Sequence, residues 1–132
     1  MSQENVEIMR RVIDAFNSGA LDVALEDFAP AATLDWSHSR GPNAGVYVGH
    51  DAMRRFWADM TGPFERQTFV AGEFILHGER VVVPVVGRMT GRGGIEVEAE
   101  TAMVATFRDG RVVRLTMYQD KPEALKAVGL RD

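Results

Sequence analysis

The segment TLDWSHSRG, residues 33–41, places a histidine close to a tryptophan and an aspartate. A strand is predicted for its first six residues, and strand side chains alternate between the two faces. Leu34, Trp36 and His38 are therefore expected on the covered face, and Asp35 on the other face, in solvent or paired with a loop. Histidine exchanges protons near neutral pH, and burial against Trp36 would lower the pKa of His38. His38 is a candidate acid or base, with a merely polar strand end as the alternative.

A second candidate proton carrier, Asp120, follows the last predicted strand. In that strand Val113, Leu115 and Met117 alternate with polar residues, and the same phase directs Gln119 toward the covered face. Asp120 also fits as the N-cap of a closing helix in DKPEALKAVGL, because Glu123 stands three residues later as in a capping box. Both interpretations of Asp120, general base and helix cap, stay open.

Several function classes are disfavoured by composition. The chain has 19 acidic and 15 basic residues, a net charge of −4, and no aromatic residues interleaved with its Arg pairs, so nucleic acid is not expected as a partner. It has no cysteine, and its three histidines lack metal-site spacing, so no metal and no cofactor are expected. The longest apolar run, residues 81–86, is too short to span a membrane, and a cytoplasmic location is expected.

The elements that must position these residues follow from hydrophobic periodicity. Apolar residues spaced three and four apart predict helices at 6–18, at 21–28 before Pro30, and at 52–60. A Gly-rich loop, SRGPNAG, is expected between the first strand and the third helix. The rest predicts a four-stranded meander, QTFVAGEFILHG, RVVVPVVGRMTG, IEVEAETAMVATF and RVVRLTMYQD, followed by the short closing helix.

Helices followed by a long run of strands indicate a single α+β domain over residues 1–132. We expect a cone-shaped, strongly curved antiparallel sheet, covered in part by the three helices of the N-terminal half. Partial cover leaves an apolar pocket that is open at one end. The side chains expected to bind a ligand there are mostly aromatic or Met: Phe16, Trp36, Trp57, Met60, Met103 and Gln119.

The chain resembles SnoaL-like proteins of the nuclear transport factor 2-like superfamily over essentially its whole length. The resemblance rests on ENVEIMRRVIDAFNSGALDVALEDFAP, GVYVGHDAMRRFW, FRDGRVVRLTMYQD and EALKAVGL. It implies the ketosteroid isomerase and polyketide cyclase type of fold and, commonly, pairing of two copies through the outer face of the sheet. It does not imply one reaction, because the superfamily includes isomerases, cyclases, epoxide hydrolases, dehydratases and members that only bind or dimerise.

Matching the family's catalytic positions to this chain excludes one chemistry and leaves two open. The three positions of the ketosteroid isomerase site fall on Val12, Trp36 and close to Met103, none of which ionises. An epoxide hydrolase of the limonene type needs an Asp-Arg-Asp relay; Arg88 and Asp120 could contribute to one, but no second strand carboxylate is in phase. In SnoaL-like cyclases the catalytic aspartate precedes a tail ending in Leu-Gly, which corresponds here to Asp120.

Two hypotheses from different classes follow. In the first, the chain binds a small hydrophobic molecule in an apolar cavity and carries out cofactor-free acid-base catalysis, with His38 and Asp120 as proton carriers. In the second, it is a non-catalytic ligand-binding or dimerisation module. An enzyme needs a titratable group directed into the cavity and a binding protein does not. A homodimer is expected through outward-facing residues such as Val104 and Thr116.

Overall fold

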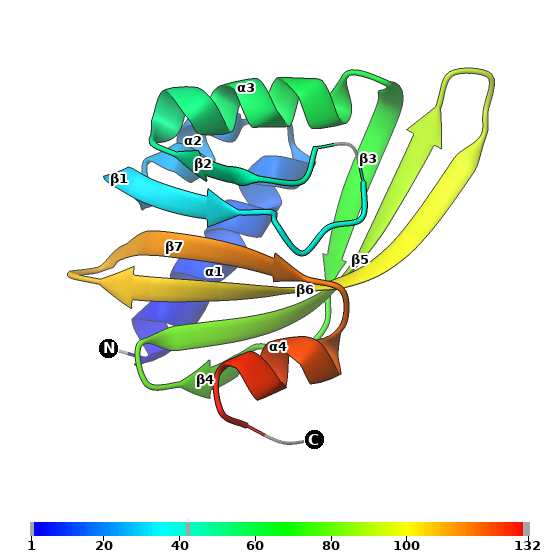
Figure 1. Cartoon of the computed structure of the whole chain (residues 1–132). Coiled ribbons are helices and arrows are strands. Elements are labelled where there is room, and N and C mark those ends of the chain that lie inside the picture. Colours follow the sequence, from blue (N-terminus) through cyan, green and yellow to red (C-terminus); the bar gives the residue numbers. More distant parts are fainter. Residues whose placement is uncertain (1, 42, 131–132) are drawn as a thin grey trace.

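A computed structural model describes residues 2–41 and 43–130 (Figure 1). Pro42 of the predicted loop and the extreme ends of the predicted domain lie outside these residues. The described residues form, in chain order, α1 (Ser2–Asn17), α2 (Leu21–Leu25), β1 (Phe28–Asp35), β2 (Val46–Val48), α3 (His50–Thr61), β3 (Phe64–Ala71), β4 (Ile75–His77), β5 (Arg80–Gly91), β6 (Glu96–Arg108), β7 (Arg111–Tyr118) and α4 (Lys121–Ala127). The predicted α+β class, with helices over a large curved sheet, is confirmed.

The sheet has the strand order β2-β1-β7-β6-β5-β3, with β4 also paired to β5. All neighbours are antiparallel except β1 and β7, so the expected antiparallel sheet contains one parallel pair. A parallel pair needs a long connection between its strands, and here the chain from β2 to β6 supplies it. This pairing places the polar end of β1 beside β7.

One predicted strand is divided in the structure, and one strand was not predicted. QTFVAGEFILHG forms two strands, β3 and β4, which pair with different parts of β5. The interruption lies opposite Val83 and Pro84, and Pro84 has no N–H to donate to a ladder. β2 was not predicted because its three residues form a short edge strand with exposed valines directly after the predicted loop.

The second helix is shorter than predicted, because Phe28 belongs to β1. Phe28 pairs with Val112 of β7, and the register of the two strands shifts between Phe28 and Thr33. Pro30 lies within this irregular stretch, where the missing N–H is tolerated. β1 ends at Asp35 rather than at His38.

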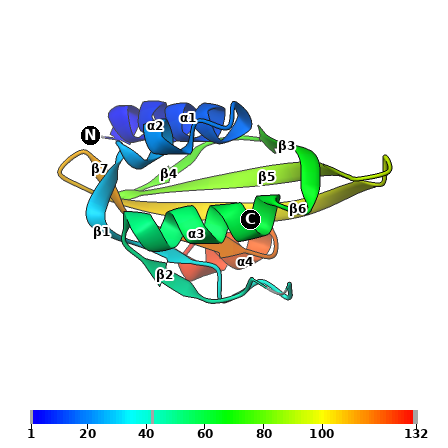
Figure 2. The ribbon, with the colours of Figure 1, turned by 90° about the horizontal axis from the view of Figure 1, so that it is seen from above.

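The three N-terminal helices cover one face of the sheet, here called the inner face (Figure 2). The predicted apolar stripe of α1 is buried there, with Met9 and Val12 fully enclosed. β5 and β6 contribute Val83 and Met103 to the same core. The far end of the β5–β6 hairpin extends beyond the helices, so the inner face is only partly covered (Figures 1 and 2).

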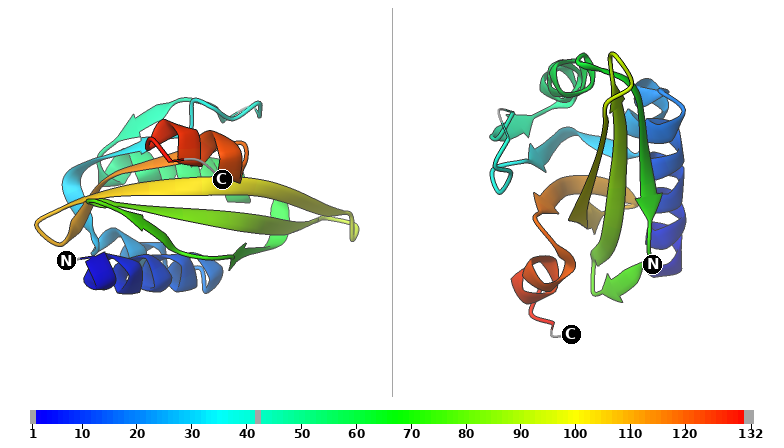
Figure 3. Two further views of the ribbon diagram at one scale, coloured as in Figure 1. Left: turned by 90° about the horizontal axis from the view of Figure 1, so that it is seen from below. Right: turned by 90° about the vertical axis from the view of Figure 1, so that its right-hand side faces the viewer.

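α4 packs against the opposite, outer face of the sheet (Figure 3). Its residues Ala124 and Leu125 form a second core cluster with Val82 and Val104. Val104 and Thr116 do face outward as expected, but each is only 5% exposed. They are therefore buried within the chain, and any dimer surface on the outer face must lie beyond α4.

Asp35 joins the parallel strands β1 and β7. Its carboxylate accepts hydrogen bonds from Arg114 at 2.6 Å and from the amide and hydroxyl of Ser37 at 3.0 and 2.6 Å. Burial alone would raise the pKa of Asp35, but these hydrogen bonds outweigh it, so the pKa lies below its usual value. Asp35 faces away from the pocket and bonds to Ser37 of the following turn, as expected, but it is buried rather than in solvent and is also paired with Arg114 of β7.

Replacing Asp35 with Asn should lower the free energy of unfolding at pH 7 by about 1–3 kcal/mol, because Arg114 loses its charged partner. The pKa of Asp35 is depressed on folding, so its stabilising contribution is complete above the unfolded pKa of about 3.9 and disappears as the pH falls through the lower folded value. Urea unfolding across this pH range should therefore show that the free energy of unfolding falls less steeply with decreasing pH in Asp35→Asn than in the wild type. Asp22→Asn is the matched control, since the Asp22 side chain is 81% exposed in its pair with Arg54. Equal effects of the two substitutions would contradict the assignment.

α4 begins with the predicted cap at Asp120, and Glu123 reaches back to the residue before the cap rather than to the cap itself. The Asp120 carboxylate accepts a hydrogen bond from the Glu123 amide at 2.9 Å, and the Glu123 carboxylate accepts one from the Gln119 amide at 3.0 Å. Lys121 follows as the first helical residue, and Pro122 lies in the first turn. Backbone N–H groups in the first turn have no partner within the helix, so the missing N–H of proline costs nothing there. The helix-cap interpretation of Asp120 is confirmed.

Asp120→Ala should lower the free energy of unfolding by about 1 kcal/mol through loss of the cap. Asp120→Ser should restore most of this loss, because serine is also a good N-cap. Thermal or urea unfolding measures both variants. Full stability in Asp120→Ala would show that the cap contributes nothing.

Candidate functional site

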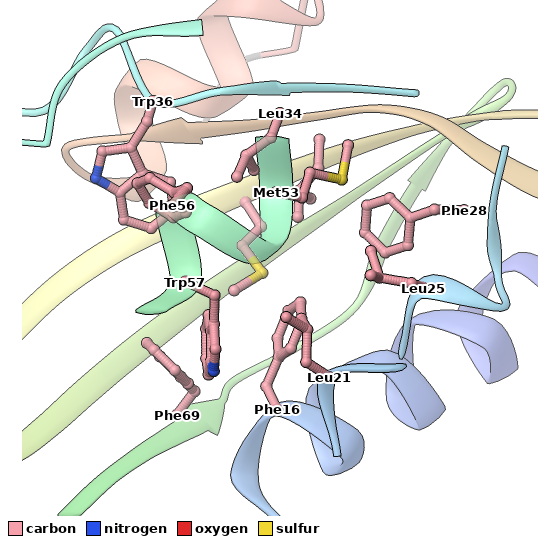
Figure 4. A pocket seen from close by; sticks show the side chains of 12 residues that line it. Phe16, Leu21, Leu25, Phe28, Leu34, Trp36, Met53, Phe56, Trp57 and Phe69 are labelled. Carbon is pink, nitrogen blue, oxygen red and sulfur yellow. The ribbon is translucent and has the colours of Figure 1, made fainter. Parts of the chain in front are cut away.

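An apolar pocket lies between the inner face of the sheet and the helices; we call it the inner pocket (Figure 4). Its volume is about 40 Å³. α1 and α2 close one side, α3 closes another, and β6 and β7 form the floor. Its lining consists only of apolar and aromatic side chains: Phe16, Leu21, Leu25, Phe28, Leu34, Trp36, Met53, Phe56, Trp57, Phe69, Met103 and Leu115.

Aromatic contacts hold this lining together. Phe16 at the end of α1 stacks on Trp57 of α3 with ring centroids 5.0 Å apart, and Trp57 contacts Phe69 of β3 at 6.1 Å. Trp36 packs against Phe56 at 4.8 Å. Aromatic pairs at these distances are favourable and keep the rings in place. Four of the predicted ligand-binding residues line the inner pocket, namely Phe16, Trp36, Trp57 and Met103.

A wider pocket adjoins the inner pocket under the free end of the β5–β6 hairpin; we call it the mouth pocket. Its volume is about 360 Å³. Trp36 and Phe69 line both pockets. Gly87 lies directly opposite Phe69 across the strand pair, and a Cβ at Gly87 would contact the Phe69 ring at 3.6 Å. The remaining lining is Ser39, Gly41, Asn43, Met60, Pro63, Phe64, Met89, Ala99, Thr101 and Met117, which includes the predicted Met60.

His38 does not face either pocket, so its predicted orientation was wrong. β1 ends at Asp35, and Ser37 and His38 form a turn, so the alternation of a strand no longer applies. The exposed His38 ring stacks on Tyr118 at 4.6 Å. Tyr118 lies on the outer face, as its strand phase predicts, and the histidine is therefore directed away from the apolar lining.

Gln119 and Asp120 both follow β7 but line different pockets. Asp120 lines a groove on the outer side of the sheet with Pro84 and Val86, and is absent from the lining of the inner and mouth pockets. The Gln119 side-chain amide donates a hydrogen bond to the His38 carbonyl and lines a third pocket beside the mouth pocket. The two predicted proton carriers are thus not brought together around a common cavity.

The inner and mouth pockets contain no ionisable side chain among the described residues. Tyr118, which lines a further pocket together with Trp36, has a pKa that is raised first by burial and then by the charge of Asp35. Its phenol therefore stays protonated at neutral pH and can donate a hydrogen bond. This arrangement suits binding of an apolar molecule better than proton transfer.

Phe69, Met89 and Met117 are pocket residues that sequence reasoning did not select. Met117 had been placed on the correct face by strand phase, but nothing indicated which part of that face the helices leave uncovered. Phe69 alternates with the exposed Val70 in β3, so its phase was a usable signal. An inward-facing residue lines a pocket only where the helices do not cover it, and the extent of that cover is not visible in the sequence.

Other chemistries find no support in the part of the chain that the structure describes. No three His, Asp or Glu side chains gather there in a way that could hold a metal ion. Arg88, considered for an epoxide hydrolase relay, is bonded to Glu98 at 3.0 Å on the exposed hairpin. No helix of residues 2–41 and 43–130 is long and apolar enough to cross a membrane.

Known proteins resemble this chain in fold over nearly its whole length. An NTF2-like protein from Burkholderia pseudomallei K96243 superposes with a TM-score of 0.79 at 25% identity, over 96% of this chain and 98% of that one. TerC, crystallised with polyporic acid, gives 0.79 at 20% identity over 95% and 98%. A Jannaschia sp. CCS1 protein named as a SnoaL-like polyketide cyclase gives 0.77 at 21% identity over 96% and 92%. No curated protein matches the sequence.

The sequence also matches the model of the SnoaL-like domain over residues 9–115. This match covers most of the chain and confirms the resemblance inferred from the sequence. The chain belongs to the family of SnoaL-like domains.

Proposed function

We propose that this protein binds a small apolar molecule whose body occupies the mouth pocket and whose end reaches toward the inner pocket. The observation that carries the proposal is that two adjoining pockets share the aromatic side chains Trp36 and Phe69 in their lining. Size determines where the body of the ligand lies. A cavity of about 150 Å³ is known to hold benzene, so the inner pocket at about 40 Å³ is too small for a ring and the mouth pocket at about 360 Å³ is large enough.

Binding without acid-base chemistry is the better supported of the two hypotheses. A proton carrier must lie within hydrogen-bond reach of the reacting group. His38 stacks on Tyr118 and Asp120 caps α4, and neither lines the inner or mouth pocket. The proposal therefore assigns the apolar side chains to ligand binding and assigns no role in catalysis to His38 or Asp120.

A protein of similar fold has been crystallised with a small organic molecule. TerC, which shares the fold at 20% identity, was crystallised with polyporic acid. This precedent supports a ligand of the same general size for the present chain.

Ala99→Phe should weaken binding of the neutral fluorescent dye Nile red by at least about tenfold, because a phenyl ring would fill the mouth pocket that Ala99 lines. Nile red titration followed by dye emission, with Trp36 and Trp57 emission as a second signal, measures the change.

The matched control is Val97→Phe. Val97 is two residues away on the same strand and face, is exposed, and lies outside the mouth pocket. It should leave dye affinity unchanged. If Ala99→Phe is folded by circular dichroism and binds the dye like the wild type, the mouth pocket is not the binding site.

Dimerisation is a second candidate function, favoured by an apolar strip on the part of the outer face that α4 leaves open. Val70, Pro84 and Val86 line a groove of about 340 Å³ there, and Val70 is 47% exposed. Exposed apolar groups that form a continuous surface are typical of protein interfaces. Pairing of two copies would bury this strip.

Light scattering at micromolar concentration should then give the mass of a dimer, and Val86→Lys should give a monomer, because an unpaired charge would be buried in the interface. Val48→Lys is the control, since Val48 is exposed on β2, at the other end of the strand order. A monomeric wild type would rule out this function.

A further inference from the structure

A third pocket opens from the mouth pocket beside the end of β7; we call it the slot. Its volume is about 250 Å³. The slot lies between residues 36–41, which follow β1, and the strands β6 and β7. Ser39, Thr101 and Gln119 give it a polar lining that the inner pocket lacks.

The slot exists because β7 is shorter than β6. The two strands are in register only from Ala102 to Arg108 of β6, and β7 ends at Tyr118. The preceding segment of β6, residues 96–101, therefore has no strand beside it on this edge. An unpaired strand edge presents backbone N–H and C=O groups that can bond to another molecule.

The three pockets adjoin one another. Trp36 lines all of them, and Ser39, Ala99, Thr101 and Met117 line both the mouth pocket and the slot. Polarity increases from the inner pocket through the mouth pocket to the slot. The inner pocket is wholly apolar, the mouth pocket adds Ser39, Asn43 and Thr101, and the slot adds Gln119 and Tyr118.

The hydrogen-bonding groups of the slot suit a neutral partner. The Ser39 hydroxyl oxygen accepts a bond from the Gly41 amide at 3.0 Å, so its hydrogen is still available to donate. The hydroxyl of Thr101 can both donate and accept. Gln119 binds the His38 carbonyl and so ties the wall of residues 36–41 to the end of β7.

The charges at the slot disfavour an ionised partner. Arg40 and Glu100 both line it. An anion would be attracted by Arg40 but repelled by Glu100, and a cation the reverse, so neither ion gains a net attraction that offsets the hydration it loses on entering. An uncharged hydroxyl or carbonyl has neither disadvantage.

We propose that the ligand is an elongated amphipathic molecule, with its apolar body in the mouth pocket and an uncharged hydroxyl or carbonyl end in the slot. This inference rests on the proposed function, because it names the class of ligand for the same site. The slot contributes selectivity, whereas the apolar pockets contribute most of the affinity.

Three probes that differ only at one end test it: heptylbenzene, 4-heptylphenol and 4-heptylbenzoate. Their dissociation constants are measured by displacement of Nile red at pH 7, where the phenol is neutral and the benzoate is charged. The phenol should bind at least about tenfold more tightly than the benzoate. Thr101→Val should weaken binding of the phenol about three- to tenfold, the usual effect of one lost hydrogen bond. It should leave the affinity for heptylbenzene unchanged.

Thr101→Ser should restore phenol binding, because it returns the hydroxyl. Thr106→Val is the control for the substitution itself, since Thr106 is on the same strand outside all three pockets. The inference is overturned if the wild type binds 4-heptylbenzoate as tightly as 4-heptylphenol. It is also overturned if Thr101→Val loses the same affinity for 4-heptylphenol as for heptylbenzene. Either result leaves the proposal of apolar binding intact. If neither Nile red nor heptylbenzene binds the wild type, the proposed function is wrong, and the inference is wrong as well because it rests on that function.

Discussion

The difference in length between the central strands and the helices that cover them determines the core and the pockets of this protein. A residue adds about 3.3 Å to a strand but only 1.5 Å to a helix. The 13 residues of β6 therefore extend over about 43 Å, whereas the 12 residues of α3 extend over about 18 Å and the 16 of α1 over about 24 Å. The helices bury one end of the β5–β6 pair and leave the other end open. The mouth pocket and the slot lie where this cover stops.

The two faces of the sheet have different uses because different helices cover them. α1, α2 and α3 close the inner face around the apolar pocket, and α4 closes part of the outer face. The polar residues at the ends of β1 and β7 are drawn to the outer side, where Asp35 bonds Arg114 and His38 stacks on Tyr118. The inner side is left with aromatic and Met side chains, which adapt to apolar ligands of various shapes.

Local signals predicted most of the elements correctly and failed where long-range pairing overrode them. The stripe of α1, the helix near residues 50–61, the Asp-Gly hairpin and the cap at Asp120 depend on neighbours a few residues apart, and all are present. Phe28 continued a helical pattern but joined β1, because Val112 of β7 offered it a strand partner. A predicted strand is divided into two opposite Val83 and Pro84, and no local pattern indicated which neighbour of Pro84 would be interrupted.

The sequence by itself determined the α+β class, the family, and the set of aromatic and Met side chains available for a pocket, because periodicity and composition are properties of the chain. Only the tertiary structure decided what those side chains surround. His38 is two residues from Trp36, so a continued strand would have placed both inside, but pairing of β1 with β7 ends at Asp35 and a turn directs His38 outward. The position of the turn is set by contacts with Arg114 and Gln119, which are about 80 residues away along the chain. Such contacts arise from packing of the whole sheet and leave no local pattern in the sequence.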